Sequence, residues 1–394
     1  MLDVYVMLRD HGSCMESSQI LLASEFATLP ALIKAFAAER PDAPAVADPD
    51  GRISWRELDA FVDRIAAKLQ ADGVGPGQAT AIAGLNSVMQ VCVFLATLRV
   101  GAIAGLITNT ATGEQMAAMI VDSGANHLFL DEKAAESLDG QSFGAPKRIS
   151  MDGGAWGEPL LDWMAPEGAA PQPVEITPKT GFNIIYSSGT TGTPKGIVHS
   201  HAMRWQHIQR GVAAYGPASV TILSTPLYSN TTMASFLPTL GSGGEVVLMK
   251  KFDTLGFLQL AERERATNTM LVPVQYRRIM AHPMSVIGSD GIPHDAHPHP
   301  RLWGTFPRVL GLYARELRLF SLETAVHKMT GRPAAVFGMV DRGVIREGAY
   351  ADLVMFDPDT VIDRATFENP KQESAGIDEV WANGISTFVA GKGA

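Results

Sequence analysis

Tyr186-Ser-Ser-Gly-Thr-Thr-Gly-Thr-Pro-Lys-Gly196 is the most informative segment of the chain. The apolar run Phe182-Asn-Ile-Ile185 precedes it and Ile197-Val198 follows it, and β-branched residues enrich both runs, as in buried strands. Glycines let the backbone approach an anion closely and direct N–H groups towards it. The hydroxyls add donors, and Lys195 adds a positive charge. The sequence therefore predicts a phosphate-binding loop between two strands.

Two other interpretations of this loop are weaker. A Walker A loop requires Gly-Lys-Ser/Thr at the start of a helix, whereas here Pro194 precedes the lysine. A flexible Ser/Gly/Thr linker has the same composition. However, a linker has no reason to lie between apolar strands or to end in Pro-Lys-Gly.

The loop resembles the signature loop of the adenylate-forming superfamily, which includes acyl-CoA synthetases, firefly luciferase and the adenylation domains of peptide synthetases. The resemblance implies ATP with magnesium as cofactor and a small-molecule carboxylate and CoA as partners. It also gives Lys195 a catalytic role, because its charge would neutralise the leaving pyrophosphate. The nucleotide phosphates would be held by Ser187, Ser188, Gly189, Thr190, Thr191, Gly192, Thr193 and Lys195.

The bulk composition excludes several classes of protein. The chain has 394 residues, of which 46% are apolar and 19% charged, as expected for a globular protein of two or three domains. Its net charge of −9 argues against nucleic acid or anionic membranes as partners. With only two cysteines and an N-terminus unlike a signal peptide, the sequence predicts a cytoplasmic protein. The most apolar run, 91–107, is too short and too broken to span a membrane.

From about residue 25 to residue 282, helix and strand patterns alternate. This alternation predicts an α/β fold with mainly parallel sheets and helices on both faces. Ser54 and Glu57 form a capping box at the start of one helix. Helices are expected at 29–38, 55–70, 87–100, 232–240 and 257–265, and strands at 45–47, 51–55, 79–83, 220–224, 245–249 and 269–273.

This succession again resembles adenylate-forming enzymes, through Ser54 to Leu58, the Asn86-Ser87 pair and the Pro226-Leu-Tyr228 segment, which in the family lies near the acyl pocket. The fold implied is the N-terminal part of the family's large domain. The resemblance ends near residue 282. The family's Tyr-Gly-x-Thr-Glu loop, which holds adenine and magnesium, does not occur in this sequence, nor does its C-terminal catalytic lysine.

The composition changes at about Met284. Helices are expected at 306–316 and 321–329, and a pair of strands at 343–348 and 351–357. Gly288-Ser-Asp-Gly291 and Ala351-Asp-Leu-Val-Met-Phe-Asp357 resemble the C-terminal end of an amidohydrolase, specifically an N-acyl-D-amino-acid deacylase. The implied fold is a fragment with helices and a small β-sandwich piece. We therefore expect three regions, an unassigned segment at 1–24, a truncated AMP-binding domain at 25–283 and an amidohydrolase fragment at 284–394.

By the same resemblance, Asp290 is the aspartate that binds metal or activates the attacking water. Such a carboxylate can take a proton from zinc-bound water and deliver it to the leaving amine. Zinc is therefore a possible cofactor of the C-terminal fragment. The site is incomplete, because the family's other metal ligands would precede this segment and the first 283 residues belong to another fold.

Histidines elsewhere are weaker candidates for metal ligands. His199-Ser-His201 follows the loop, where adenylate-forming enzymes commonly carry a similar pair that holds no metal. A second group, His294, His297 and His299, could bind a divalent ion, but a proline-stiffened surface loop is the more favoured interpretation.

Three functions follow from these patterns. The first is an ATP-dependent carboxylate–CoA ligase that forms an acyl-adenylate, incomplete and of low or no activity. The second is a zinc-dependent hydrolase of N-acyl-D-amino acids. The third is a catalytically inactive fusion of two truncated genes, which would leave apolar surface exposed in the C-terminal region.

Overall fold

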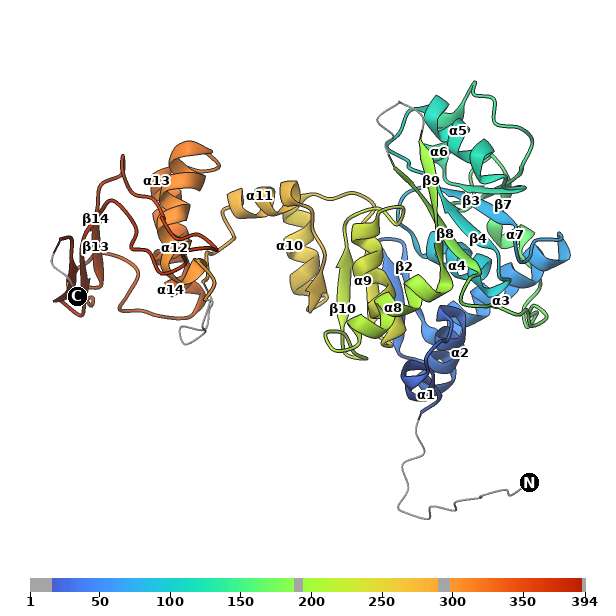
Figure 1. Ribbon diagram of the computed structural model, residues 1–394, viewed down its shortest axis with the longest axis horizontal. Coiled ribbons are helices and arrows are strands. Elements are labelled where there is room, and N and C mark those ends of the chain that lie inside the picture. Colours follow the sequence, from blue (N-terminus) through green and yellow to red (C-terminus); the bar gives the residue numbers. More distant parts are fainter. Residues whose placement is uncertain (1–15, 188–193, 290–297, 392–394) are drawn as a thin grey trace, which may run out of the picture. The chain divides into compact units, whose positions relative to one another are not determined.

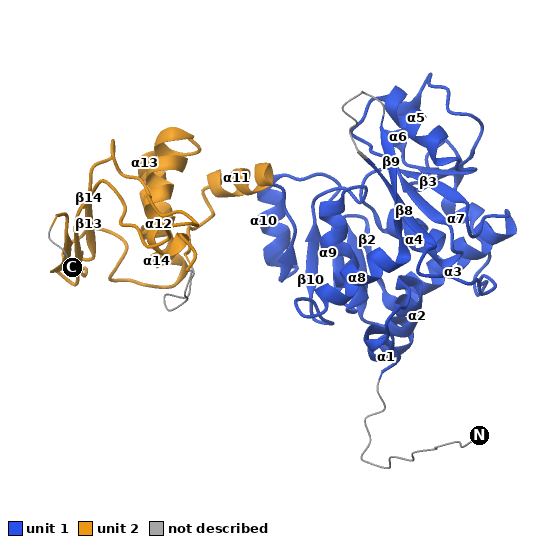
Figure 2. Ribbon diagram, viewed as in Figure 1, with its two compact units in different colours: residues 1–272 blue, residues 273–394 orange. Residues whose placement is uncertain are grey.

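The computed structural model describes residues 16–187, 194–289 and 298–391. The chain forms two compact units, residues 1–272 and 273–394 (Figures 1 and 2). The domain limits expected from the sequence remain predictions, because a division into compact units does not test where the similarity to one family ends.

Unit 1 contains two sheets, which together confirm the predicted α/β class. The seven-stranded sheet has the order β7-β6-β5-β3-β4-β8-β9. Adjacent strands in it are parallel, except that β8 and β9 are antiparallel. Its strands are β3 (Ala79–Ala83), β4 (Ile103–Leu106), β5 (His127–Leu130), β6 (Lys147–Ser150), β7 (Glu158–Pro159), β8 (Gly181–Ser187) and β9 (Lys195–Ser200).

The five-stranded sheet has the order β12-β10-β11-β1-β2. Adjacent strands in this sheet are parallel except for the hairpin of β1 and β2, where Asp48 pairs with Gly51 across the turn Pro49-Asp50. Its strands are β1 (Pro44–Asp48), β2 (Gly51–Ser54), β10 (Val220–Leu223), β11 (Glu245–Leu248) and β12 (Asn268–Thr269).

Helices cover these sheets (Figure 1). The capping box predicted from Ser54 and Glu57 is formed at the start of α3, and the buried side chains of this helix follow its apolar stripe. The helices of unit 1 are α1 (Ser17–Ala23), α2 (Leu29–Glu39), α3 (Trp55–Ala71), α4 (Val88–Arg99), α5 (Gly113–Ser123), α6 (Glu132–Leu138), α7 (Leu160–Trp163), α8 (His201–Gly211), α9 (Asn230–Gly241) and α10 (Thr254–Arg263).

The core of unit 1 centres on α4, nearly all of whose residues are buried. Phe94 of this helix lies edge-on to Phe182 of β8 and to Phe236 of α9, with ring centroids 5.7 and 5.8 Å away. The central helix thus packs against a strand of one sheet and against the helix that leads into β11 of the other. This packing holds the two sheets around one core.

Unit 2 has a much smaller core. It consists of α11 (Pro273–Ala281), α12 (Arg301–Arg308), the π-helix η1 (Val309–Glu316), α13 (Leu322–Met329), α14 (Gly331–Val336) and a sheet of β13 (Leu353–Phe356), β14 (Ile377–Ala382) and β15 (Ile385–Val389). The sheet is antiparallel in the order β13-β14-β15. Five buried hydrophobic residues form the core cluster, namely Val309, Leu310, Ala314, Ala325 and Val361.

Three expected elements differ from the structure. Residues 343–348 form no strand, and β13 pairs instead with β14. The expected helix 306–316 is divided, because Pro307 cannot donate a backbone hydrogen bond and a π-helix follows it from Val309. The strand expected at 269–273 ends at Thr269, and Pro273 begins α11.

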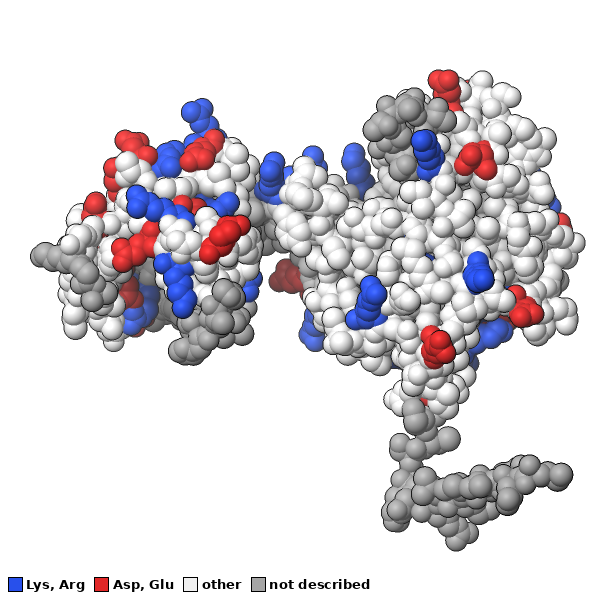
Figure 3. Space-filling model, in the orientation of Figure 1, with Lys and Arg blue, Asp and Glu red and all other residues white. Residues whose placement is uncertain are grey.

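The charged residues on the face shown in Figure 3 are of both signs and interspersed. Over unit 2, lysines and arginines alternate with aspartates and glutamates without forming one large field of a single sign. Among the described residues, no helix is both long enough and apolar enough to cross a bilayer.

Candidate functional site

The predicted phosphate loop connects β8 to β9, which confirms the expectation of a loop between two strands. Ser187 at the end of β8 pairs with Lys195 at the start of β9, and Tyr186 pairs with Gly196. Lys195 is exposed at this end of the hairpin. Ser188, Gly189, Thr190, Thr191, Gly192 and Thr193 lie outside the described residues, as do the side chain of Ser187 and the whole of Asp290.

The loop begins at the carboxyl edge of the seven-stranded sheet. Strands β3, β4 and β8 are parallel neighbours, so their carboxyl ends meet at one edge of the sheet. Ligands of open α/β sheets bind in the crevice outside these ends. The order of the strands thus places the loop where a ligand of this fold class is expected.

The base of the loop is fixed by close packing. Tyr186 is buried and its hydroxyl donates a hydrogen bond to the carbonyl oxygen of Met119, at 2.9 Å. Burial, together with the negative charge of Asp122, raises the pKa of the Tyr186 hydroxyl, so it stays a donor. Gly196 lies opposite, where a Cβ atom would be 2.9 Å from Asp122 Oδ2 and 3.0 Å from Ile184 Cγ2.

Replacing Gly196 with valine should therefore disturb the loop more than the fold. The added side chain would displace Asp122 and the ring of Tyr186, so the hairpin would re-pack where the loop starts. We expect nucleotide affinity, measured by isothermal titration calorimetry with ATP and magnesium, to fall at least about tenfold, which corresponds to about 1.4 kcal/mol.

The matched control for this variant is Gly75→Ala, because a Cβ atom at Gly75 meets nothing within 4 Å. It should leave nucleotide affinity unchanged. Equal affinity of Gly196→Val and the wild type for ATP would contradict the assignment of this hairpin to phosphate binding.

Asn86 joins the two sheets at their carboxyl edges. It follows β3, and its Nδ2 donates to the carbonyl oxygens of Thr225 and Met249, at 3.0 and 3.3 Å. Its Oδ1 accepts a hydrogen bond from the backbone N–H of Leu227, at 3.2 Å. Thr225 and Met249 follow β10 and β11, so a single buried amide fixes the ends of strands from both sheets.

Beside Asn86 lies a pocket of about 380 Å³ at the same edges. Its charged lining side chains are all lysines, namely Lys133, Lys250 and Lys251, and no acidic residue is among its described lining residues. Leu85, Asn109, Thr110, Ser224, Pro226 and Phe252 complete the wall. This combination of ammonium groups, amides and hydroxyls suits an anionic ligand.

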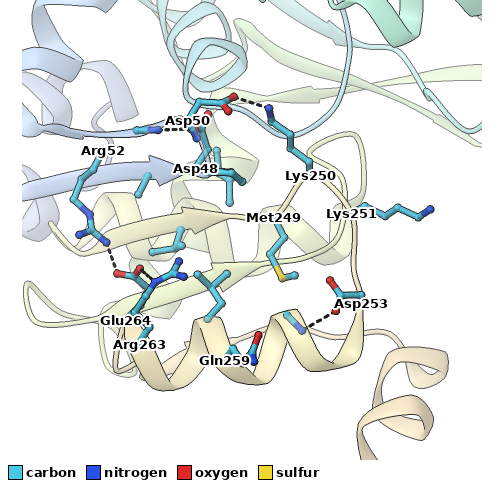
Figure 4. Close-up of a pocket in the computed structure, with 17 residues that line it drawn as sticks. Asp48, Asp50, Arg52, Met249, Lys250, Lys251, Asp253, Gln259, Arg263 and Glu264 are labelled. Atoms are coloured by element: carbon cyan, nitrogen blue, oxygen red, sulfur yellow. Dashed lines mark hydrogen bonds and ion pairs between the residues drawn. The ribbon is translucent and has the colours of Figure 1, made fainter. Parts of the chain in front are cut away.

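Two of these lysines differ in their surroundings (Figure 4). Lys250 points towards Asp50, with which it forms an ion pair at 2.5 Å. Lys251 is exposed, points away from Asp50, and has no ion-pair partner within the described parts of the chain. The pocket drawn in Figure 4 is a different and larger one, with a volume of about 780 Å³, and in it Arg52 pairs with Glu264. Because acidic and basic side chains alternate in its wall, it suits an anion less well than the lysine pocket.

The Pro226-Leu-Tyr228 segment contributes to the same edge. The Tyr228 hydroxyl lies 3.1 Å from Thr110 Oγ1, which links the loop before α9 to the loop after β4. Thr110 and Pro226 both line the lysine pocket. The aromatic segment that the sequence associates with an acyl pocket is therefore adjacent to the proposed anion site.

His199 and His201 are both buried. The ring of His201 lies edge-on to Phe182, with centroids 4.9 Å apart, and burial lowers its pKa to about 4. Burial also lowers the pKa of His199, helped by the positive charge of Arg204. Within the described residues no group of three His, Cys, Asp or Glu side chains could hold a metal ion.

His201 predicts an acid-sensitive fold. Its pKa lies near 6.5 when unfolded and about 4 when folded, so as the pH falls from 6.5 to 4 only the unfolded state takes up the proton. Stability contributed by the neutral ring is present above pH 6.5 and is lost through this window, by up to about 3 kcal/mol. His201→Phe should remove that part of the pH dependence, as measured by urea unfolding at pH 7 and pH 4.5. The same pH dependence in both proteins would contradict this account.

The candidate metal ligands of the C-terminal region are far in sequence from the phosphate loop and the lysine pocket. His299 lies with its ring edge-on to Phe367, with centroids 5.0 Å apart. His294 and His297 lie beyond the described residues, like Asp290. The described part of unit 2 therefore brings together no set of ligands that fits zinc.

Comparison with protein families gives two matches. A family profile described as AMP-binding enzyme matches residues 33–311, more than half of the chain. The chain belongs to the AMP-binding enzyme family. A second profile, described as Amidohydrolase family, matches residues 254–388. The two matches overlap at 254–311.

Individual relatives follow the same division. The indoleacetate–CoA ligase of Aromatoleum aromaticum is 29% identical over 259 residues, which cover 62% of this chain and 49% of the ligase. The D-aminoacylase of Alcaligenes xylosoxydans xylosoxydans is 56% identical over 138 residues, which cover 35% of this chain and 28% of the aminoacylase. This AMP-binding family member thus spans about half of the ligase and little more than a quarter of the aminoacylase.

Among solved structures, the N-terminal domain of FACL13 from Mycobacterium tuberculosis has a TM-score of 0.59 and 22% identity, over 66% of each chain. At this identity the likeness shows the fold alone. It confirms that the α/β architecture is that of adenylate-forming N-terminal domains.

The lysine pocket was not predicted from the sequence. Lys133 follows β5, whereas Lys250 and Lys251 follow β11. No local pattern connects residues this far apart in the chain. The usable signal was the rule that ligands bind at the carboxyl ends of parallel strands, once each strand had been assigned.

Proposed function

We propose that unit 1 binds the phosphates of ATP. We propose further that its catalytic activity is that of a carboxylate–CoA ligase that forms an acyl-adenylate. The observation that carries this proposal is the β8–β9 loop at the carboxyl edge of a parallel sheet, beside a pocket whose charged side chains are all lysines. ATP with magnesium would be held by Ser187 to Thr193 and by Lys195. When bound, it would supply the phosphoanhydride that activates the carboxylate.

The residues of the chain have separate tasks in this reaction. Lys195 would place a positive charge at the end of the loop, where pyrophosphate charge develops. The lysine pocket would attract the anionic substrates, and Lys251 is the lysine best suited to the task because it has no ion-pair partner in the described residues. Tyr228, held by Thr110, would limit the space for the acyl group.

We further propose that turnover is slow or absent. The sequence contains no Tyr-Gly-x-Thr-Glu segment to hold adenine. Binding of the phosphates and formation of the adenylate are therefore separable properties. A protein of this kind should bind ATP and exchange pyrophosphate poorly.

Two measurements test these statements separately. Titration with ATP and magnesium should give saturable binding, and absence of binding would reject the ligase-type function. Carboxylate-dependent exchange of pyrophosphate into ATP, over fatty and aryl acids, should be slow or undetectable. Exchange at the rate of a full-length ligase would contradict the proposal of an incomplete site.

A second candidate is a zinc-dependent hydrolase of N-acyl-D-amino acids. The observation in its favour is 56% identity to a D-aminoacylase over 138 residues. The described residues of unit 2 include no set of side chains that could hold zinc. Free amine released from N-acetyl-D-amino acids in the presence of zinc would support this function. Absence of release would reject it and leave an inactive fusion as the remaining interpretation of unit 2.

The third candidate is an inactive fusion of two truncated genes. It is favoured by the matches of one chain to two families, over 49% of a ligase and 28% of an aminoacylase. Independent sequencing of the DNA across codons 275 to 295 is the most direct test. A continuous coding sequence there would show that the two regions are joined in the gene. It would exclude an error in sequence assembly as the origin of the join.

A further inference from the structure

Unit 2 exposes an unusual amount of apolar surface. Ile345 is 90% exposed, Val340 80% and Phe337 72%. These residues lie between the end of α14 and the start of β13 and are defined here as the apolar loop surface, 337–345. Contiguous apolar surface of this kind marks a site of interaction in a protein that does not aggregate.

A groove adjoins the apolar loop surface. It has a volume of about 700 Å³, and Val344 and Ile345 belong both to its wall and to the loop surface. Its other walls include Phe306 of α12, Val326 of α13 and Val354 of β13. Among its described lining residues only Arg346 and Asp352 are charged. Loop, helices and sheet thus present one largely apolar face.

Polar contacts behind this face hold the loop in shape. Arg342 pairs with Asp352, donates to Asn383 Oδ1 at 3.0 Å, and lies over the ring of Tyr350 at 4.3 Å. Arg346 donates to the carbonyl oxygen of Val340. Both arginines are therefore bonded within unit 2, while Val340 and Ile345 remain exposed, which is the arrangement expected of a preformed docking surface.

The comparison with the D-aminoacylase indicates what this surface fits. The 138 matched residues are 56% identical but cover only 28% of that protein. At this identity, unit 2 keeps side chains suited to packing against the rest of a deacylase. The match pairs no residue of this chain with that remaining part. The sheet also has unpaired edges, since among the described strands β13 and β15 each pair on one side only.

We propose that the apolar loop surface and its groove dock the N-terminal portion of an N-acyl-D-amino-acid deacylase chain, supplied as a separate polypeptide. The partner would cover Phe337, Val340 and Ile345, which are exposed in this chain. The proposal concerns binding and does not depend on the ligase function of unit 1. It predicts a heteromeric complex.

The test uses the full chain with an affinity tag, co-expressed with the Alcaligenes D-aminoacylase from which the matched segment has been removed. The truncated aminoacylase should remain soluble and co-purify with the tagged chain in a 1:1 ratio. The double variant Val340→Asp/Ile345→Asp should reduce its recovery at least tenfold. Both residues are exposed, so the fold of unit 2 should be retained, which circular dichroism checks.

Two controls make the result specific. Val121→Asp/Leu161→Asp changes residues of unit 1 that are 59% and 58% exposed, and it should leave recovery unchanged. The untruncated D-aminoacylase, which carries its own segment, should not be retained by the tagged chain.

Three outcomes would overturn the proposal. The truncated aminoacylase could precipitate despite the wild-type chain, or be recovered equally with the aspartate variant. The tagged chain could also form a defined dimer that the aspartate variant dissociates while the aminoacylase stays unbound, in which case a second copy covers the surface.

Discussion

Replacing Asn86 with alanine should lower the melting temperature of unit 1 by roughly 10 °C. The variant loses three hydrogen bonds, and it leaves the backbone N–H of Leu227 and the carbonyl oxygens of Thr225 and Met249 without this partner. A buried polar group left unsatisfied costs about 1–3 kcal/mol, so three such groups cost at least about 3 kcal/mol in total. In a domain of this size each kcal/mol lowers the melting temperature by roughly 2–4 °C.

The same change should also weaken ATP binding, because Asn86 fixes the ends of strands that line the lysine pocket. Asn109→Ala is the matched control. Asn109 lines the same pocket, but within the described residues its side chain makes one hydrogen bond, from Nδ2 to the carbonyl oxygen of Gly84 at 2.7 Å. Differential scanning calorimetry should therefore show a shift about one third as large. Equal melting temperatures for the two variants would mean that Asn86 does not join the sheets.

The sequence predicted the scaffold of unit 1 well because the determinants of its elements are local. The Ser54 and Glu57 side chains lie three residues apart and form the capping box that begins α3. The Phe182 to Ile185 run is buried in β8, as its apolar character required. The hairpin around the phosphate loop followed from two such runs with a Gly-rich segment between them.

The site was less predictable, because contacts between distant residues define it. The Asn86-Ser87 pair was noticed in the sequence, but its bonds to Thr225 and Met249 cross more than one hundred residues. Lys133 and Lys251 meet at one pocket only after two different sheets have formed. Pairings of this kind are set by topology, which no local pattern encodes.

Unit 2 was predicted less accurately for a different reason. The segment 343–348 has the apolar residues of a strand, yet Arg342 and Arg346 tie it into a loop by polar contacts, and β13 finds its partner at β14. These contacts override the local propensity of segment 343–348 to form a strand. In addition, β14 (Ile377–Ala382) occupies the position beside β13 that this segment was expected to fill. The expected exposure of apolar surface in this region is seen at Val340 and Ile345.

Phe94→Ala should be strongly destabilising, with a loss of about 3–5 kcal/mol in the free energy of unfolding. Phe94 is fully buried and contacts Phe182 and Phe236 edge-on. Truncation removes both ring contacts and leaves a cavity between α4, β8 and α9, which a close-packed core cannot fill without strain. Urea unfolding followed by tryptophan fluorescence should show a lower midpoint with an unchanged slope.

Phe94→Leu separates loss of volume from loss of the aromatic contacts, since leucine refills most of the space and should cost less than half as much. Val121→Ala serves as the surface control, because Val121 is exposed on α5 and its truncation should change stability by less than about 0.5 kcal/mol. If Phe94→Ala were no more destabilising than Val121→Ala, the core could not be centred on α4. The two sheets would then have to be held together mainly by polar links such as Asn86, and the Asn86 variant would become the more damaging of the two.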